Sequence, residues 1–255
     1  MNLKLTNPVK KNNSIRNRVN YSMPDFSTDK FKYLLKPFKG SSGRGQHGKI
    51  TVRHKGYLKP SKLITVDYCR DIFNTPYTVI GLVRDNFRTA PIMLLRDTNG
   101  TYRYSLYTDS VAIDQSIRTT FYFYSFRTSC GDTIPVGWVP KNTIISNLEL
   151  GPGFGGKVGR SAGVYLKVLS HSYGYVEVQA PSKKKFFVSK YSLATIGRIG
   201  FIDHKLEKKG SAGVNRSKGF RPTVRGEAMN AVDHPHGGRT KGGKPRQSPW
   251  GKIFK

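Results

Sequence analysis

Short apolar runs follow one another through the middle of the chain, bounded by glycine, proline, asparagine and aspartate. The runs are rich in β-branched and aromatic residues, which favour strands over helices. Asn99 and Gly100 stand between two of them and form a dipeptide that strongly favours a β-hairpin. The five predicted strands are 63–68, 77–83, 91–96, 101–107 and 121–126. Five short strands in succession predict a small barrel over residues 61–125.

A second series of similar runs predicts another small barrel over residues 126–200. Residues 171–174 supply a hairpin turn between two of its strands, and residues 191–195 could form a single helical turn. The predicted strands are 133–139, 143–148, 164–170, 175–179 and 185–188. The expected fold is therefore mostly β, with two barrels in sequence.

The two ends of the chain lack this pattern. Pro8, Pro24 and Pro37 interrupt residues 1–40, and from Lys208 onward glycines alternate with cations without any hydrophobic period. Ordering a backbone costs about 1–2 kcal/mol per residue, which such segments cannot recover by burying apolar surface. We expect a basic N-terminal extension over 1–60 and a glycine- and arginine-rich C-terminal extension over 201–255, each ordered against a partner.

The distribution of charge agrees with this division. The chain of 255 residues has a formal net charge of +29. Residues 61–150 carry 9 basic and 8 acidic residues, whereas residues 1–60 carry 14 and 2 and residues 206–255 carry 12 and 3. Such an excess needs a polyanion, and nucleic acid, an anionic membrane or an acidic protein would each qualify. At 36% hydrophobic residues the chain still has enough apolar material for a core.

Several classes of protein are disfavoured by the sequence. No apolar run approaches the roughly 18 residues of a spanning helix, and no secretory signal is visible. The first 25 residues resemble a mitochondrial transit peptide in composition, but a basic arm lying on RNA is the preferred interpretation. Cys69 and Cys130 lack the spacing of a zinc ribbon or a disulfide framework. A membrane-surface binder lacks a basic amphipathic helix.

Two glycine-rich loops carry cations. Residues 41–57 combine four glycines with Arg44, Lys49, Arg53 and Lys55, which favours RNA contact over a flexible linker. Residues 151–157 fit the GxxxxGK part of a nucleotide-binding P-loop, but Val158 replaces the hydroxyl residue that would hold Mg²⁺ and a strand follows instead of a helix. The preferred interpretation is a bare backbone that nests against phosphate. An NTP-dependent nucleic-acid enzyme is the alternative.

Residues 221–252 contain a pair of histidines, His234 and His236, that invites a metal or catalytic interpretation. The pair lacks a third ligand with zinc spacing, and no nucleophile accompanies it. We expect no metal, no cofactor, no catalytic residue and no small-molecule substrate. Trp250 could stack on a base or fill a hydrophobic gap. Lys183–Lys185 is a hairpin tip for which a solvated turn and a phosphate contact are about equally plausible.

The segment RPTVRGEAMNAVDHPHG, residues 221–237, closely resembles the signature of the large-subunit ribosomal protein two family (uL2). The resemblance extends to GGKVGRSAG and to ITVRH, and it implies an OB-like barrel followed by an SH3-like barrel. It also implies binding to large-subunit rRNA, with Arg70 matching an rRNA-contacting arginine and His234 near the peptidyl-transferase region. Neighbouring ribosomal proteins and the small subunit are the other implied partners, with a role in subunit association.

The ending RTKGG…PWGK is more similar to the mitochondrial and alphaproteobacterial branch of that family. The expected location is the mitochondrial ribosome in the matrix, with the bacterial cytoplasm as the alternative. The expected rRNA-binding residues are Arg44, Lys49, Arg53, Lys55, Arg70, Lys157, Arg160, Arg216, Lys218, Arg221, Arg225, His234, His236, Arg239, Lys241, Lys244, Arg246 and Trp250.

Overall fold

The computed structural model describes residues 3–6, 18–21, 28–38, 40–56, 61–85, 87–121, 129–207, 211–238 and 245–253. The chain forms two compact units. Unit 1 joins Met1–Phe38 to Ser61–Lys208, and unit 2 joins Lys39–Pro60 to Lys209–Lys255. Within the described ranges, no helix has the length and apolar character needed to cross a membrane.

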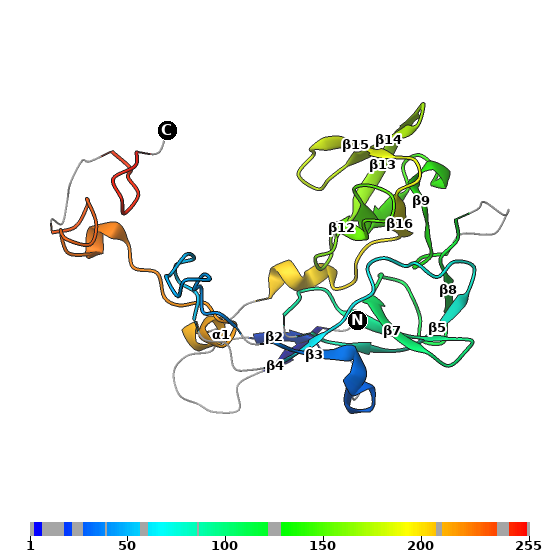
Figure 1. Ribbon diagram of the computed structural model, residues 1–255, viewed down its shortest axis with the longest axis horizontal. Coiled ribbons are helices and arrows are strands. Elements are labelled where there is room, and N and C mark those ends of the chain that lie inside the picture. Colours follow the sequence, from blue (N-terminus) through cyan, green and yellow to red (C-terminus); the bar gives the residue numbers. More distant parts are fainter. Residues whose placement is uncertain are drawn as a thin grey trace. The chain divides into compact units, whose positions relative to one another are not determined.

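The first barrel is built around one antiparallel sheet of unit 1. Its strand order is β7-β6-β5-β8 (Figure 1), and Val66 adds a parallel bridge to Tyr104 of β7. A shorter pair, β3-β4, lies in the same unit. The strands are β3 (Leu35–Phe38), β4 (Ser61–Ile64), β5 (Pro76–Val83), β6 (Ile92–Asp97), β7 (Tyr102–Leu106) and β8 (Ser116–Arg118). The predicted fold class, mostly β with an OB-like barrel first, is confirmed.

Strand β6 is buried on both of its faces. Ile92 and Leu94 pack in one apolar cluster, whereas Met93 and Leu95 pack in another. Successive side chains of a strand point to opposite faces, so a continuous apolar run can serve two layers at once. The run that the sequence shows before the Asn99–Gly100 turn is therefore the centre of the first barrel.

The predicted hairpin between β6 and β7 is confirmed. Gly100 has a φ of 79° and its N–H donates to the Asp97 carbonyl at 3.0 Å, while the Asp97 N–H donates to the Thr101 carbonyl at 2.9 Å. A left-handed residue at the end of the turn suits glycine, which lacks a Cβ to clash there.

Part of the N-terminal segment contributes to this barrel. A 3-10 segment, η1 (Thr28–Leu34), places Phe31 in the same cluster as Ile92, with its ring centroid 4.7 Å from that of Tyr102. Two further strands, β1 (Leu3–Thr6) and β2 (Arg18–Tyr21), pair antiparallel. The segment predicted as an extension over 1–60 thus supplies Phe31 to the core, and its residues 39–60 belong to unit 2.

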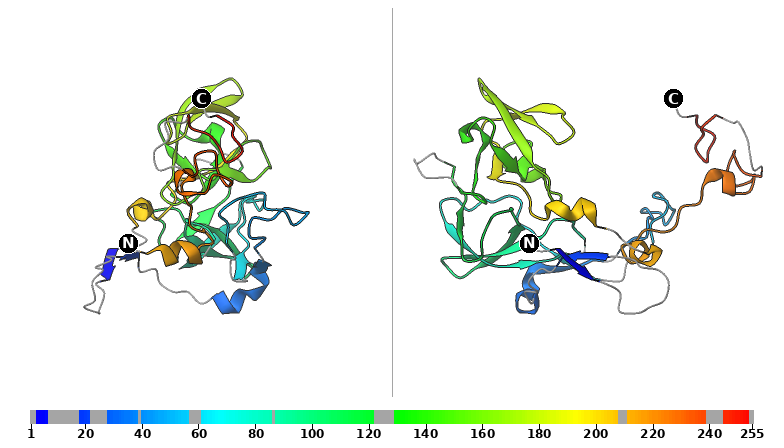
Figure 2. Two further views of the ribbon diagram at one scale, coloured as in Figure 1. Left: turned by 90° about the vertical axis from the view of Figure 1, so that its left-hand side faces the viewer. Right: turned by 180° about the vertical axis from the view of Figure 1, so that it is seen from behind.

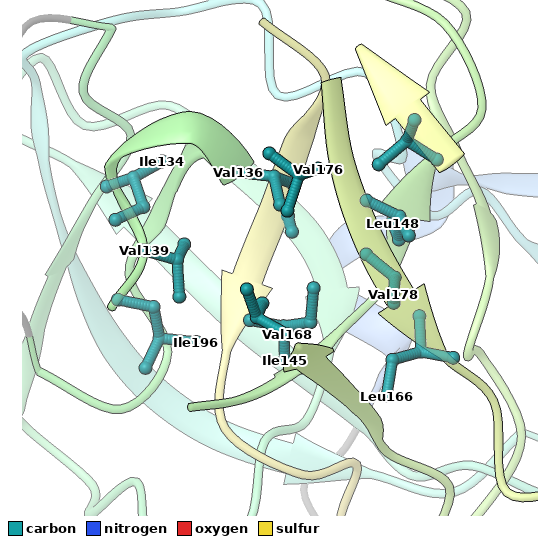
Figure 3. Packing of buried hydrophobic residues seen from close by; sticks show 12 residues of the cluster. Ile134, Val136, Val139, Ile145, Leu148, Leu166, Val168, Val176, Val178 and Ile196 are labelled. Carbon is teal, nitrogen blue, oxygen red and sulfur yellow. The ribbon is translucent and has the colours of Figure 1, made fainter. Parts of the chain in front are cut away.

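The second barrel contains a six-stranded sheet of order β15-β14-β13-β10-β16-β9 and the pair β11-β12. In Figures 1 and 2 these strands lie together, apart from β5 to β8. Figure 3 shows the core, in which Val136, Ile145 and Val168 come from different elements and are each fully buried. The strands are β9 (Thr133–Pro135), β10 (Ile144–Ser146), β11 (Leu148–Glu149), β12 (Gly156–Val158), β13 (Leu166–Ser172), β14 (Tyr175–Gln179), β15 (Lys185–Ser189) and β16 (Leu193–Ile196).

Several predicted elements of this region need correction. The helical turn expected at 191–195 is wrong, because Leu193–Ile196 is strand β16, which pairs with both β10 and β9. The strand expected at 143–148 breaks at Asn147, whose φ of 47° turns the chain from β10 into β11. The one expected at 133–139 ends at Pro135 and continues as η2 (Val136–Trp138).

Other expectations are changed less. Strand β8 was not predicted, and the expected strand 121–126 lies outside the described residues except for Phe121. The turn between β13 and β14 is confirmed near its expected place, with Gly174 at a φ of 85°. Unit 1 ends after η3 (Ile202–Leu206), and unit 2 contains α1 (Ala212–Ser217) and η4 (Gly226–Ala228).

Candidate nucleic-acid interface

Unit 2 brings together two glycine-rich segments that are far apart in sequence. The Gly56 N–H donates to the Gly219 carbonyl at 2.7 Å, and the Arg221 N–H donates to the His54 carbonyl at 3.0 Å. The His54 ring completes the contact through Nδ1, which lies 3.1 Å from the Pro222 carbonyl. A carbonyl only accepts, so this nitrogen carries the hydrogen. The two predicted extensions therefore share one backbone framework.

The N-terminal loop of this unit is folded rather than extended. The Thr51 and Val52 N–H groups both donate to the Gly43 carbonyl, at 2.9 and 3.1 Å. A Cβ on Gly43 would lie 2.2 Å from the Val52 carbonyl oxygen, and its φ is 78°, so the position requires glycine. The structure thus disfavours a plain flexible linker for 41–57.

Cations cover this framework. The exposed ones among the described residues are Arg44, Lys49, Arg53, Lys55, Arg216, Lys218, Arg221, Arg225, Arg246 and Lys252. Apart from Lys218, none of these cations forms an ion pair with another described residue. The surface therefore gathers positive charge on closely spaced backbone turns, which is what a phosphate backbone neutralises.

Trp250 lies at the end of the same unit and is 78% exposed. The guanidinium carbon of Arg53 lies 4.8 Å from the centroid of its ring. Of the two roles considered for Trp250, this exposure favours an aromatic surface over a filled gap. Arg239, Lys241 and Lys244, predicted nearby in the sequence, lie outside the described residues.

The histidine pair is held inside its own turn. His234 is 8% exposed, and its Nδ1 accepts from the His236 N–H at 3.1 Å. A Cβ on Gly226 would lie 2.5 Å from the His234 ring, so the ring rests directly on backbone. His236 is half-buried, and its Nε2 donates to the Pro245 carbonyl at 2.8 Å. His234 shapes the turn from within, and His236 ties it to the last segment.

The second glycine-rich loop, in unit 1, departs from the expected phosphate nest. The buried carboxylate of Glu149 accepts N–H groups from Gly153 at 3.2 Å and from Gly155 at 3.0 Å, and also that of Leu193 at 3.1 Å. The Phe154 N–H donates to the Gly151 carbonyl and the Gly156 N–H to the Tyr68 carbonyl. Four successive amides thus have acceptors within the protein, and none of them is left for a phosphate.

The same loop does not support the NTP alternative. Lys157 lies on strand β12, where a P-loop would begin a helix. Its side chain is exposed, with Nζ 5.5 Å from the Phe154 ring centroid. Arg160 is also exposed, and its guanidinium lies 4.8 Å from the Tyr68 ring centroid. Both cations are placed to contact a partner through their side chains.

Arg70 lies inside the first barrel. It is 6% exposed, its Nη2 donates to Ser105 Oγ, and its backbone N–H donates to Asp67 Oδ1 at 3.0 Å. Burial lowers the pKa of the guanidinium below its ordinary value, and the Asp67 charge partly opposes that shift. This geometry gives Arg70 an internal role and does not present it to rRNA.

Sequence reasoning missed two residues of the glycine-rich loop. Glu149 follows the strand predicted at 143–148, where a buried acid is not expected, and Phe154 stands alone among glycines. A signal for Glu149 was nonetheless present, because a loop rich in free amides needs acceptors. No group of three or more potential metal-ligating side chains occurs within the described part of the chain.

A mostly β protein with two barrels and a cationic surface on paired glycine-rich segments belongs to the class that binds polyanions. Comparison with models of protein families shows which family within that class the chain matches. The model described as "Ribosomal Proteins L2, RNA binding N-terminal domain" matches residues 31–119. The one described as "Ribosomal Proteins L2, C-terminal domain" matches residues 129–251.

Two bacterial relatives agree with the family models. The "Large ribosomal subunit protein uL2" of Hydrogenobaculum sp. (strain Y04AAS1) is 38% identical over 230 residues, covering 86% of this chain and 80% of its own length. That of Paracoccus denitrificans (strain Pd 1222) is 37% identical over 227 residues, covering 88% and 80%. The chain belongs to the ribosomal protein L2 (uL2) family.

Proposed function

We propose that the protein is a structural, non-catalytic component of the large ribosomal subunit that binds large-subunit rRNA. The observation that carries this proposal is the exposed cationic surface of unit 2, whose cations other than Lys218 form no ion pair among the described residues. Membership of the uL2 family supports it, and both relatives are named as proteins of the large ribosomal subunit.

The proposed interface keeps most of the residues expected from the sequence. Exposed cations of unit 2 and of the glycine-rich loop would contact phosphates, and Trp250 would offer an aromatic face. The set is Arg44, Lys49, Arg53, Lys55, Lys157, Arg160, Arg216, Lys218, Arg221, Arg225, Arg246 and Trp250. The buried residues Arg70 and His234 would act from within by holding the fold, and His236 by closing its turn.

We also propose that the protein contacts neighbouring ribosomal proteins and the small subunit, and that it supports the peptidyl-transferase region. These parts of the proposal are supported by family membership alone. We also propose the mitochondrial ribosome as the location, supported by the alphaproteobacterial relative and the sequence of the C-terminal segment. Recovery of the chain with large subunits from washed mitochondria would test the location, and recovery with bacterial cytoplasmic ribosomes is the alternative outcome.

Salt dependence tests the electrostatic basis of rRNA binding. The logarithm of the affinity of the full chain for large-subunit rRNA should fall linearly with the logarithm of salt concentration, because each neutralised phosphate contributes about −0.7 to −0.9 to the slope. Replacing Arg216, Arg221 and Arg225 together by glutamine should make this negative slope shallower by about 2–3. Filter binding over a salt series measures this.

The matched control is Arg96→Gln, which removes an exposed arginine of β6 outside the proposed interface. It should leave the slope nearly unchanged. A slope near zero for the wild-type chain, or equal slopes for the triple variant and the control, would contradict the proposed surface.

A further inference from the structure

The glycine-rich loop of unit 1 carries an exposed aromatic ring at its tip. Phe154 is 70% exposed and stands between Gly153 and Gly155, whose φ angles are 78° and 70°. A Cβ on Gly151 would lie 3.1 Å from Cδ2 of the ring, so a larger residue there would crowd it. The local backbone thus turns the ring outward and leaves most of its surface open.

The backbone behind the ring is fixed. Glu149 accepts from the amides on both sides of Phe154, and the next amide, that of Gly156, is bonded to the Tyr68 carbonyl at 2.9 Å. Glu149 also accepts from Leu193 of β16, which anchors the loop to the sheet of the second barrel. A ring held on such a frame loses little further backbone freedom when it binds.

The loop carries two exposed cations, of which Lys157 lies beside the ring, and their charge is not neutralised by ion pairs among the described residues. Lys157 Nζ is 5.5 Å from the Phe154 centroid, and Arg160 Nη1 donates to the Gly156 carbonyl at 3.4 Å. Neither Lys157 nor Arg160 belongs to an ion pair within the described residues. The acid of this loop, Glu149, is 1% exposed and is occupied by three amides.

An exposed aromatic face on a loop that also carries two exposed cations matches the chemistry of an unpaired nucleotide. A base offers a face for stacking and its phosphates offer charge, whereas an apolar protein partner would leave the cations uncompensated. We propose that Phe154 stacks on an unpaired base of large-subunit rRNA while Lys157 and Arg160 contact the adjoining phosphates. The inference rests on the proposed function and adds a residue that recognises a base.

The test separates stacking from charge. The full chain is titrated with a single-stranded RNA of about ten nucleotides and with a strand of the same length whose sugars lack bases. The affinity for the RNA divided by the affinity for the strand without bases reports the contribution of the bases, since the phosphates are common to both strands. Phe154→Leu should lower that ratio roughly 5- to 150-fold, the range for loss of one stacked base.

Phe187→Leu is the matched control, because Phe187 is a 64% exposed phenylalanine of β15 in the same unit, outside the loop. Its ratio should stay within about twofold of the wild-type value. Thermal unfolding of both variants checks that the fold is kept, as expected for exposed side chains.

The outcomes distinguish this inference from the proposed function. Equal ratios for Phe154→Leu and Phe187→Leu would overturn stacking by Phe154 while leaving rRNA binding intact. A wild-type chain that binds neither strand nor large-subunit rRNA would overturn the proposed function itself. As a positional check, large-subunit rRNA carrying 5-iodouridine should photocrosslink within residues 151–157, and crosslinks confined to other peptides would also contradict the inference.

Discussion

Tyr104 and Tyr107 lie near one another in sequence, but their hydroxyl groups differ in whether they form a hydrogen bond. Tyr104 is fully buried, and its hydroxyl has no hydrogen-bond partner among the described residues. The Tyr107 hydroxyl donates to the Val111 carbonyl at 3.2 Å. Burial raises the pKa of both phenols above the ordinary value, so both stay neutral at physiological pH. A buried hydroxyl without a partner costs free energy, whereas a bonded one contributes.

We expect the two tyrosine-to-phenylalanine variants to differ in sign. Tyr104→Phe should leave the free energy of unfolding unchanged or raise it by about 1 kcal/mol, because it removes an unsatisfied polar atom. Tyr107→Phe should lower it by about 1 kcal/mol, since it breaks a hydrogen bond. Urea denaturation of each variant measures the change, and a larger loss for Tyr104→Phe than for Tyr107→Phe would refute the assignment.

Arg70 shows why single residues are hard to place from sequence. An arginine among polar residues is normally exposed, and its pairing with Ser105 joins positions 35 residues apart. Its φ of 49° and the acceptor Asp67 carry it inward, and neither can be seen in the local pattern. The exposure of the cations of unit 2 could be predicted from the local sequence alone, because charged side chains without apolar neighbours remain exposed to solvent.

At the scale of elements, Glu149 joins three parts of the second barrel. It ends β11, accepts from the glycine-rich loop and accepts from β16. Glu149→Gln should lower the free energy of unfolding by about 2–4 kcal/mol, because the amide NH₂ would face N–H donors that then lose their acceptor. Urea denaturation measures this loss, and hydrogen exchange at Gly153 and Gly155 should accelerate.

The control for this variant is Glu177→Gln on β14. Its carboxylate pairs with Lys185 at 3.5 Å and accepts from Ser170 at 3.0 Å near the surface. Loss of such a partly solvated ion pair should lower the free energy of unfolding by no more than about 1 kcal/mol. Equal losses for the two variants would show that the Glu149 carboxylate does not hold the loop.

Most strands could be predicted because the preference of a short apolar run for a strand is a local property. Residues 77–83 are rich in apolar and β-branched residues, residues 176–179 alternate apolar and polar positions, and both lie in strands of the structure. The helical turn at 191–195 failed because pairing of β16 on both sides outweighs its weak local preference. The phosphate nest failed for a related reason, since Glu149 and the Tyr68 carbonyl had already taken its amides.

At the scale of the whole molecule, the two compact units predict a selective effect of truncation. A chain ending at Lys208 loses the partners of His54 and Gly56 but keeps the apolar clusters of both barrels. Its thermal midpoint should stay within about 4 °C of the full chain, as for a change of less than about 1 kcal/mol. Limited trypsin digestion should then cut at Arg44, Lys49, Arg53 and Lys55 faster than in the full chain.

Affinity for rRNA should also fall in the truncated chain, because it lacks the cations after residue 208. Unfolding of the barrels on truncation would show instead that the C-terminal segment is part of their structural core. The sequence indicated the irregular character of both ends, but it gave no sign that they meet. Their contact rests on backbone hydrogen bonds, which leave no pattern of side chains to recognise.

The backbone bonds between residues 54–56 and 219–222 also set an order of events during synthesis. His54 and Pro222 are 168 residues apart, and translation proceeds at about 5–20 residues per second. The N-terminal loop is therefore synthesised roughly 10 to 30 seconds before residues 219–222, to which it will bond. Throughout that interval its cations and the Gly56 amide lack the partners of the finished protein, so this loop can bind a polyanion near the ribosome before unit 2 is complete.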